Sequence, residues 1–176
     1  MAGTSEKQSS ISLSFWAPLL AAAVGLVTFL VYLPALQNGF VEWWDDQWYV
    51  TANPGIRSLD LDFLVWAFTS VVHFNWHPLT IISYAIDYAI WGLNPFGYHL
   101  VNNVLHAVNT ALVFMLTLRL IAISGEKDRA GAVPSSPGTF EMTSAMVAAL
   151  LFGLHPLHVE SVAWVSERKD LLSTLF

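Results

Sequence analysis

The amino-acid sequence predicts an all-α integral membrane protein with three transmembrane helices, the start of a fourth and a large outer loop that contains interfacial helices. The composition supports this class, because 55% of the 176 residues are hydrophobic and only 11% are charged, whereas soluble domains have about 25% charged residues. Long stretches without Asp, Glu, Lys or Arg also have the roughly 20 residues that a spanning helix needs.

The first predicted span covers residues 15–36 and follows a cytoplasmic tail, residues 1–14. Its apolar run is longer than the core of a signal peptide and no small-residue cleavage site follows it, so a retained helix is favoured over a cleaved one. The second and third spans are predicted at 98–123 and 143–157. Between them, 124–142 is predicted to be a cytoplasmic loop, because this segment mixes charge with Gly, Pro and Ser.

The large outer loop is predicted at residues 37–97, since basic residues near the amino terminus and between the later spans favour a cytoplasmic location for those segments. Within it, 59–72 and 79–91 are expected to form interfacial helices rather than a span, because polar residues and a proline separate them. A shorter outer loop, 158–170, leads into the start of a fourth span at 171–176.

Charge and cysteine content exclude several classes of function. Seven Lys and Arg against thirteen Asp and Glu give a formal net charge of -6, which repels phosphate backbones, so nucleic acid is not an expected partner. The absence of cysteine excludes disulfides, thiolate metal sites and thiol nucleophiles. The partner that composition predicts is the lipid bilayer.

Asp45 and Asp46 are the first candidates for catalysis. They lie among tryptophans shortly after the first span. Adjacent carboxylates in apolar surroundings repel each other and lose hydration, a setting that favours proton uptake, so one of them could take a proton from an alcohol. The alternative is an interfacial loop in which the aromatic residues anchor the helix end and the aspartates cap a turn.

Further polar candidates follow in the outer loop and in the second span. His77 precedes a proline, Asp87 lies further along the loop, and His99 begins the second span; each has an alternative role as a cap or as part of a polar helix face. A polar stripe in the second span is expected to face protein rather than lipid, and consists of Asn102, His106 and Asn109.

The segment after the third span carries a dense group of charged and histidine side chains. His155, His158 and Glu160 could bind zinc, but the proline between the histidines breaks the helix that would align them, so no metal site is predicted. On a continuous helix Arg168 would lie near Glu160, and Lys169 beside it would complete an anion cradle. The alternative for the basic pair is anchoring to lipid headgroups.

Four ordered motifs together resemble one family, the TMTC-type protein O-mannosyltransferases, which carry tetratricopeptide repeats and belong to the GT-C class of glycosyltransferases. The motifs are FVEWWDDQWYVTANP at 40–54, WHPLT at 76–80, GLNPFGYHLVNNVLHAVN at 92–109 and LHPLHVESVAWVSERKDLL at 154–172. The resemblance implies a multi-pass protein of the bacterial inner membrane or the endoplasmic reticulum membrane. It also implies transfer of a sugar from a polyprenyl-phosphate donor to a hydroxyl acceptor such as protein Ser or Thr. The name of the family indicates that this sugar is mannose.

The resemblance also implies roles for individual residues. Asp45 aligns with the family's catalytic base and Asp46 with its second acid, while His77 matches the histidine of a His-Pro-Pro motif. Arg168 and Lys169 are candidates for holding the donor phosphate. No cofactor beyond the lipid-linked sugar is assigned.

The departure from the family is length, because the sequence shows no 34-residue repeat. The chain is therefore expected to be a membrane glycosyltransferase of the GT-C class or an inactive amino-terminal fragment of one. The alternative function is a non-catalytic membrane scaffold for protein interactions.

Overall fold

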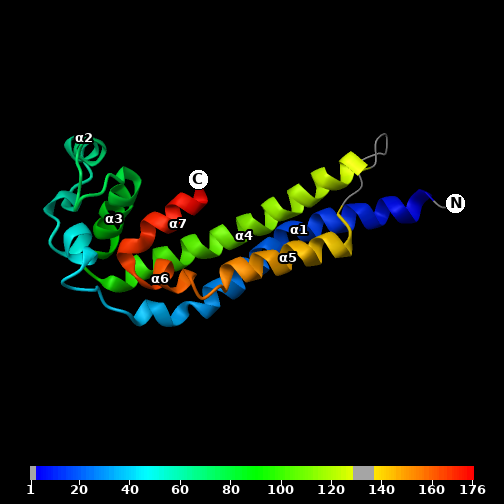
Figure 1. Cartoon of the computed structure of the whole chain (residues 1–176), viewed down its shortest axis with the longest axis horizontal. Coiled ribbons are helices and arrows are strands. Elements are labelled where there is room, and N and C mark those ends of the chain that lie inside the picture. Colours follow the sequence, from blue (N-terminus) through cyan, green and yellow to red (C-terminus); the bar gives the residue numbers. More distant parts are fainter. Residues whose placement is uncertain (1–2, 129–136) are drawn as a thin grey trace. The chain divides into compact units, whose positions relative to one another are not determined.

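The computed structural model describes residues 3–128 and 137–176, with side chains described over 15–124 and 137–176. Within these residues the chain forms helices and short helical turns and contains no β-strand (Figure 1). The longer helices are α1 (Gly3–Val31), α2 (Leu61–Thr69), α3 (Pro78–Trp91), α4 (Pro95–Asp128), α5 (Thr139–Gly153), α6 (His158–Ala163) and α7 (Arg168–Leu175). The short turns are η1 (Leu33–Gln37), η2 (Gln47–Thr51), η3 (Pro54–Arg57) and η4 (Val165–Glu167).

The chain divides into two units. The first is drawn from Met1–Leu30 and Ala107–His155, and the second consists of Val31–His106 and Pro156–Phe176. Helices α1 and α4 each contribute to both units.

The first unit packs α1, α5 and the later part of α4 through small side chains, and Figure 1 shows these helices side by side. A Cβ at Gly25 would lie 2.9 Å from the carbonyl oxygen of Ala107, so glycine permits a close approach of α1 to α4. Small residues at helix contacts are typical of membrane bundles. The buried apolar residues of this core are Ala17, Ala21, Val24, Phe114, Leu118, Met142, Ala145 and Ala149.

One helical stretch within the described residues, Pro95–Ser124, is long and apolar enough to cross a membrane, with a mean hydropathy of 1.8. Phe15–Val31 and Thr139–Gly153 are shorter apolar helices. The prediction of an all-α chain is therefore confirmed for the described residues, while three membrane crossings and a multi-pass topology stay predictions.

Local sequence explains the helices of the second unit. The side chain of Asp60 accepts a hydrogen bond of 2.7 Å from the backbone N–H of Phe63 and so caps the start of α2. Helix α3 begins with Pro78, whose missing N–H is tolerated at a first helical position, and ends at Trp91. Gly92 follows, with a φ of 59° that favours glycine. These two helices correspond to the segments expected to be interfacial.

Several helix boundaries differ from the sequence-based expectation. Helix α4 begins at Pro95 rather than near residue 98, because the side chain of Asn94 caps the backbone N–H of Phe96 and proline suits the first turn. Helix α1 begins at Gly3, inside the predicted cytoplasmic tail. The predicted loop 124–142 is helical at both of its ends, and the rest of that prediction, 129–136, lies outside the described residues.

Candidate functional site

The two adjacent aspartates have different surroundings, both within the second unit. Asp46 is fully buried. Its Oδ2 accepts a hydrogen bond of 2.8 Å from the backbone N–H of Val41, and its Oδ1 accepts from the backbone N–H of Ser166, at 2.9 Å, and from the Ser166 hydroxyl. Because three donors already occupy this carboxylate, Asp46 connects the loop to the segment before α7.

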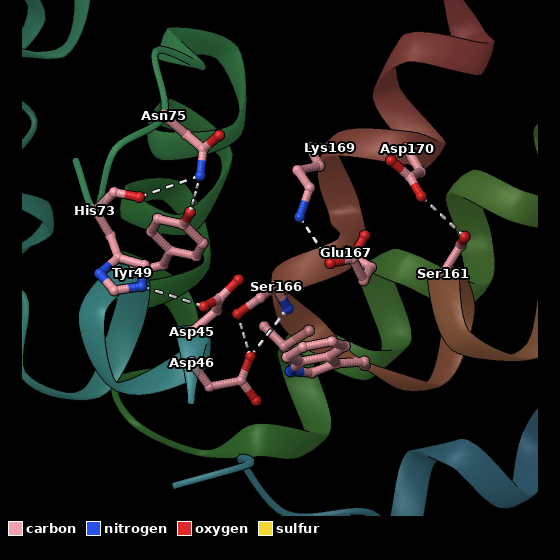
Figure 2. Close-up of polar contacts among 12 residues, drawn as sticks. Asp45, Asp46, Tyr49, His73, Asn75, Ser161, Ser166, Glu167, Lys169 and Asp170 are labelled. Atoms are coloured by element: carbon pink, nitrogen blue, oxygen red, sulfur yellow. Dashed lines mark hydrogen bonds and ion pairs between the residues drawn. The ribbon is translucent and has the colours of Figure 1, made fainter. Parts of the chain in front are cut away.

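Asp45 carries the more open carboxylate of the pair. Its side chain is 27% exposed, and its Oδ1 lies 3.4 Å from Nε2 of His73. Figure 2 shows the two carboxylates directed to different partners, with Asp45 facing the histidine and Asp46 facing Ser166. The π-helical turn η2 follows immediately, a geometry that is frequent at functional sites. Asp45 is therefore the more accessible carboxylate of the pair.

His73 was not among the residues that the sequence singled out. It lies in a two-residue turn closed by the isolated bridge between Val72 and Asn75, with φ of 45° at His73 and 67° at Phe74. Such backbone angles cost roughly 1–3 kcal/mol for each residue that is not glycine. The His73 ring stacks on Trp48 with centroids 5.4 Å apart, which fixes the ring beside Asp45.

The side chain of Asn75 stabilises this turn through two hydrogen bonds. Its Nδ2 donates to the hydroxyl oxygen of Tyr49, at 2.7 Å, and to the carbonyl oxygen of His73, at 3.1 Å (Figure 2). Tyr49 is fully buried in a hydrophobic cluster, so its hydrogen bond with Asn75 attaches the turn to the core. The other buried members of that cluster are Val50, Ile56, Phe63, Ala67, Ile81, Tyr84, Ala85, Tyr98 and Val165.

Arg168 is fully buried at the start of α7. Its Nη1 lies 2.5 Å from Oδ2 of Asp87 in α3. Its Nε donates to Oδ1 of Asn102, at 2.7 Å, and its Nη2 donates to the carbonyl oxygen of Tyr98, at 2.9 Å. Burial raises the pKa of Asp87, and the Arg168 guanidinium limits that rise. The guanidinium therefore joins α7 to α3 and α4.

The four-residue spacing that predicted contact between Glu160 and Arg168 does not correspond to a continuous helix. Helix α6 ends at Ala163, and Trp164 adopts extended backbone angles, φ of -108° and ψ of 124°. The break leaves Glu160 exposed and Arg168 buried. The predicted contact is thus wrong, because extended backbone removes the helical spacing on which it depended.

Lys169 is the more accessible member of the basic pair, with 31% of its side chain exposed, and its Nζ lies 2.7 Å from Oε1 of Glu167. Burial lowers the pKa of Lys169, but the hydrogen bond and charge of Glu167, together with Tyr49 and Asp170, raise it above its ordinary value, so the amine stays charged. It borders a cavity of about 400 Å³ whose other lining residues are Phe68, Trp76, His77, Pro78, Leu79, Thr80, Leu172, Ser173 and Phe176.

His77 lines this cavity and also interacts with the loop that contains Asp45 and Asp46. Its ring packs edge-on against Tyr49 at 4.8 Å, and its buried Nε2 has no hydrogen-bond partner among the described residues. Burial and then the positive charge of Lys169 lower the pKa of His77, while the negative charge of Asp45 raises it. The structure thus brings Asp45, His77 and Lys169 close enough to interact electrostatically.

The remaining histidine candidates have other surroundings. His99 is buried, with its Nε2 3.4 Å from the carbonyl oxygen of Gly39. His158 packs its ring against His106 at 5.2 Å. His155 is exposed in the first unit. Within the described residues, no three His, Asp or Glu side chains form a group that could hold a metal ion.

Several curated proteins are similar in sequence to this chain. Protein O-mannosyl-transferase Tmtc2 of Drosophila melanogaster is 36% identical over 154 residues, which are 82% of this chain and 14% of that protein. Protein O-mannosyl-transferase TMTC4 of Mus musculus is 32% identical over 174 residues, 92% of this chain and 22% of that protein. Protein O-mannosyl-transferase Tmtc3 of Drosophila melanogaster is 42% identical over 107 residues, 58% of this chain and 11% of that protein.

This chain therefore spans between 11% and 22% of the length of these three relatives. No protein-family model matches it, and no solved structure matches it.

Proposed function

Because this chain is a homologue of the TMTC-type protein O-mannosyl-transferases over part of their length, we propose that it supplies the acidic-loop portion of a membrane glycosyltransferase site. The reaction moves a sugar, mannose by analogy with the names of the relatives, from a polyprenyl phosphate to a hydroxyl on a protein Ser or Thr. The remaining parts of the site come from elsewhere in the complete gene product.

The observation that carries the proposal is that one unit contains both an open carboxylate and a largely apolar cavity bordered by Lys169. Asp45 is partly exposed, while the adjacent carboxylate of Asp46 is saturated by three donors. We assign Asp45 as the general base that accepts the hydroxyl proton as the sugar transfers with inversion, and Asp46 as the residue that fixes its loop. A base must be accessible to the proton that it removes, which favours Asp45.

The donor site in this proposal is the cavity beside Lys169. One ammonium group next to the apolar walls of Phe68, Trp76 and Leu172 suits a phosphate that carries a hydrocarbon chain. Arg168 is fully occupied by protein partners, so we assign it a positioning role and assign contact with the phosphate to Lys169. The site lies at the outer surface of a membrane that α4 crosses.

The test is the exchange of Asp45 for Asn in the complete gene product, assayed in membranes with polyprenyl-phosphate mannose and a Ser/Thr-containing acceptor protein. Loss of a general base lowers transfer by about 10²–10⁴-fold. Asp62→Asn is the matched control, because it makes the same change at an exposed first-turn position of α2. Wild-type transfer by Asp45→Asn would reject Asp45 as the base and favour the alternative, a non-catalytic membrane scaffold.

A further inference from the structure

The turn at residues 72–75 uses amino acids that are poorly suited to its backbone. A two-residue hairpin turn with positive φ at both central positions favours Asn-Gly, and here these positions hold His73 and Phe74. The Phe74 side chain is 91% exposed and therefore gains little from burial. Strained backbone is found often at functional sites when the residue is not glycine. We therefore infer that this turn serves to place the side chain of His73.

The imidazole of His73 is fixed on several sides. It stacks nearly parallel to Trp48, with an interplanar angle of 6°, and meets the ring of Tyr49 at 80°. The Asn75 side-chain amide donates a hydrogen bond to the His73 carbonyl oxygen. These contacts leave Nε2 directed at Oδ1 of Asp45, 3.4 Å away.

The contact with His73 is the one polar contact that the Asp45 side chain makes among the described residues. A partly exposed aspartate with one neighbour has several rotamers available. The histidine selects among them by attracting Oδ1, which leaves Oδ2 for a hydroxyl. A base that is oriented by a third group is a recurring arrangement in enzymes.

We propose that His73 is a positioning residue that orients Asp45 for removal of the acceptor proton. This inference rests on the proposed function of Asp45 and deepens it. The proton passes from the acceptor oxygen to Oδ2 of Asp45, and the freed electron pair of that oxygen forms the bond to the sugar as the bond to the donor phosphate breaks. His73 exchanges no proton in this step.

The variant His73→Asn separates orientation from folding. Asparagine tolerates positive φ better than most residues, so the turn is kept, but its side chain is too short to replace the imidazole at Asp45. We expect kcat to fall by about 10- to 100-fold, the size of effect that a misplacement near 1 Å produces. The KM for the acceptor and the unfolding transition should stay close to wild type.

Two further variants supply the control and the rescue. Asp62→Asn changes an exposed side chain of α2 and retains His73 with its ring contacts, so its kcat should equal that of the wild type. His73→Gly keeps the turn and removes the ring, so added imidazole should restore part of its activity. A purely structural role predicts a parallel loss of activity and stability in the His73 variants and no response to imidazole.

Comparison with Asp45→Asn distinguishes the possible failures. If Asp45→Asn is inactive while His73→Asn retains wild-type kcat, the positioning role is refuted and the proposed function stands. If Asp45→Asn is fully active, the proposed function itself fails. The contact is tested separately by the ¹⁵N NMR signal of His73 Nε2 in the detergent-solubilised chain, which must change in Asp45→Asn and remain unchanged in Asp62→Asn.

Discussion

Replacing Arg168 by methionine tests whether one buried ion pair fixes α7 to the neighbouring helices. The guanidinium is completely buried, and the Asp87 side chain is 4% exposed at a separation of 2.5 Å. Without Arg168, a carboxylate remains in the interior with no countercharge. Removing one partner of a buried pair costs about 3–5 kcal/mol, which increases the unfolding equilibrium constant by roughly 10²–10⁴-fold at neutral pH.

The loss of stability in Arg168→Met should depend on pH in a defined direction. Burial raises the pKa of Asp87 above its ordinary value, and Arg168 opposes this rise, so the variant raises the pKa further. A carboxyl group with a raised folded-state pKa contributes stability below its ordinary pKa, and this contribution is lost as pH rises through the folded-state value. The deficit against wild type should therefore be larger at pH 8 than at pH 5.

The measurement is equilibrium unfolding in detergent, followed by tryptophan fluorescence at several pH values. The double variant Arg168→Met/Asp87→Leu removes both charges and should recover most of the lost stability with little pH dependence. Lys169→Met is the matched control, since its partly exposed pair with Glu167 contributes about 0–1 kcal/mol. A deficit that does not change with pH, or a double variant no more stable than Arg168→Met, would refute the reasoning.

Two glycines provide tests of helix packing, one in each unit. In Gly153→Leu the first side-chain carbon would lie 2.5 Å from Oγ1 of Thr28 and 2.6 Å from Oγ1 of Thr110, so the thermal unfolding temperature should fall, as expected for overpacking of about 1–3 kcal/mol or more. In Gly97→Ala the added methyl group would overlap the ring of Trp91. Quenching by iodide should show that this tryptophan becomes more exposed.

The sequence predicts much of the fold, because the dominant signals are local. Charge-free stretches locate the apolar helices, and Pro78 marks the start of α3. The polar stripe of Asn102, His106 and Asn109 is buried, as expected of residues that are costly in lipid. Homology then confirms the resemblance that the ordered motifs indicate.

The candidate site is harder to predict from the sequence than the fold, because its contacts join residues that are far apart in the chain. The different surroundings of Asp45 and Asp46 depend on Ser166, which follows 120 positions after Asp46. The burial of Arg168 depends on Asp87 in another helix, whereas its charge alone indicates a ligand for phosphate. His73 lacks a local signal altogether, because its sequence context does not resemble a turn with positive φ.

These long-range contacts converge on residues 164–168, which follow α6 and include the start of α7. Side chains from other elements contact four of these five residues: Asn102 contacts the Trp164 carbonyl, Tyr84 the Val165 carbonyl, Asp46 contacts Ser166 and Asp87 contacts Arg168. Lys169 comes next and borders the cavity. Because Asp46 is adjacent to the proposed base and Arg168 is adjacent to the proposed phosphate ligand, this segment sets the spacing between them. Substitutions at Arg168 should therefore alter donor KM although Arg168 does not contact the cavity.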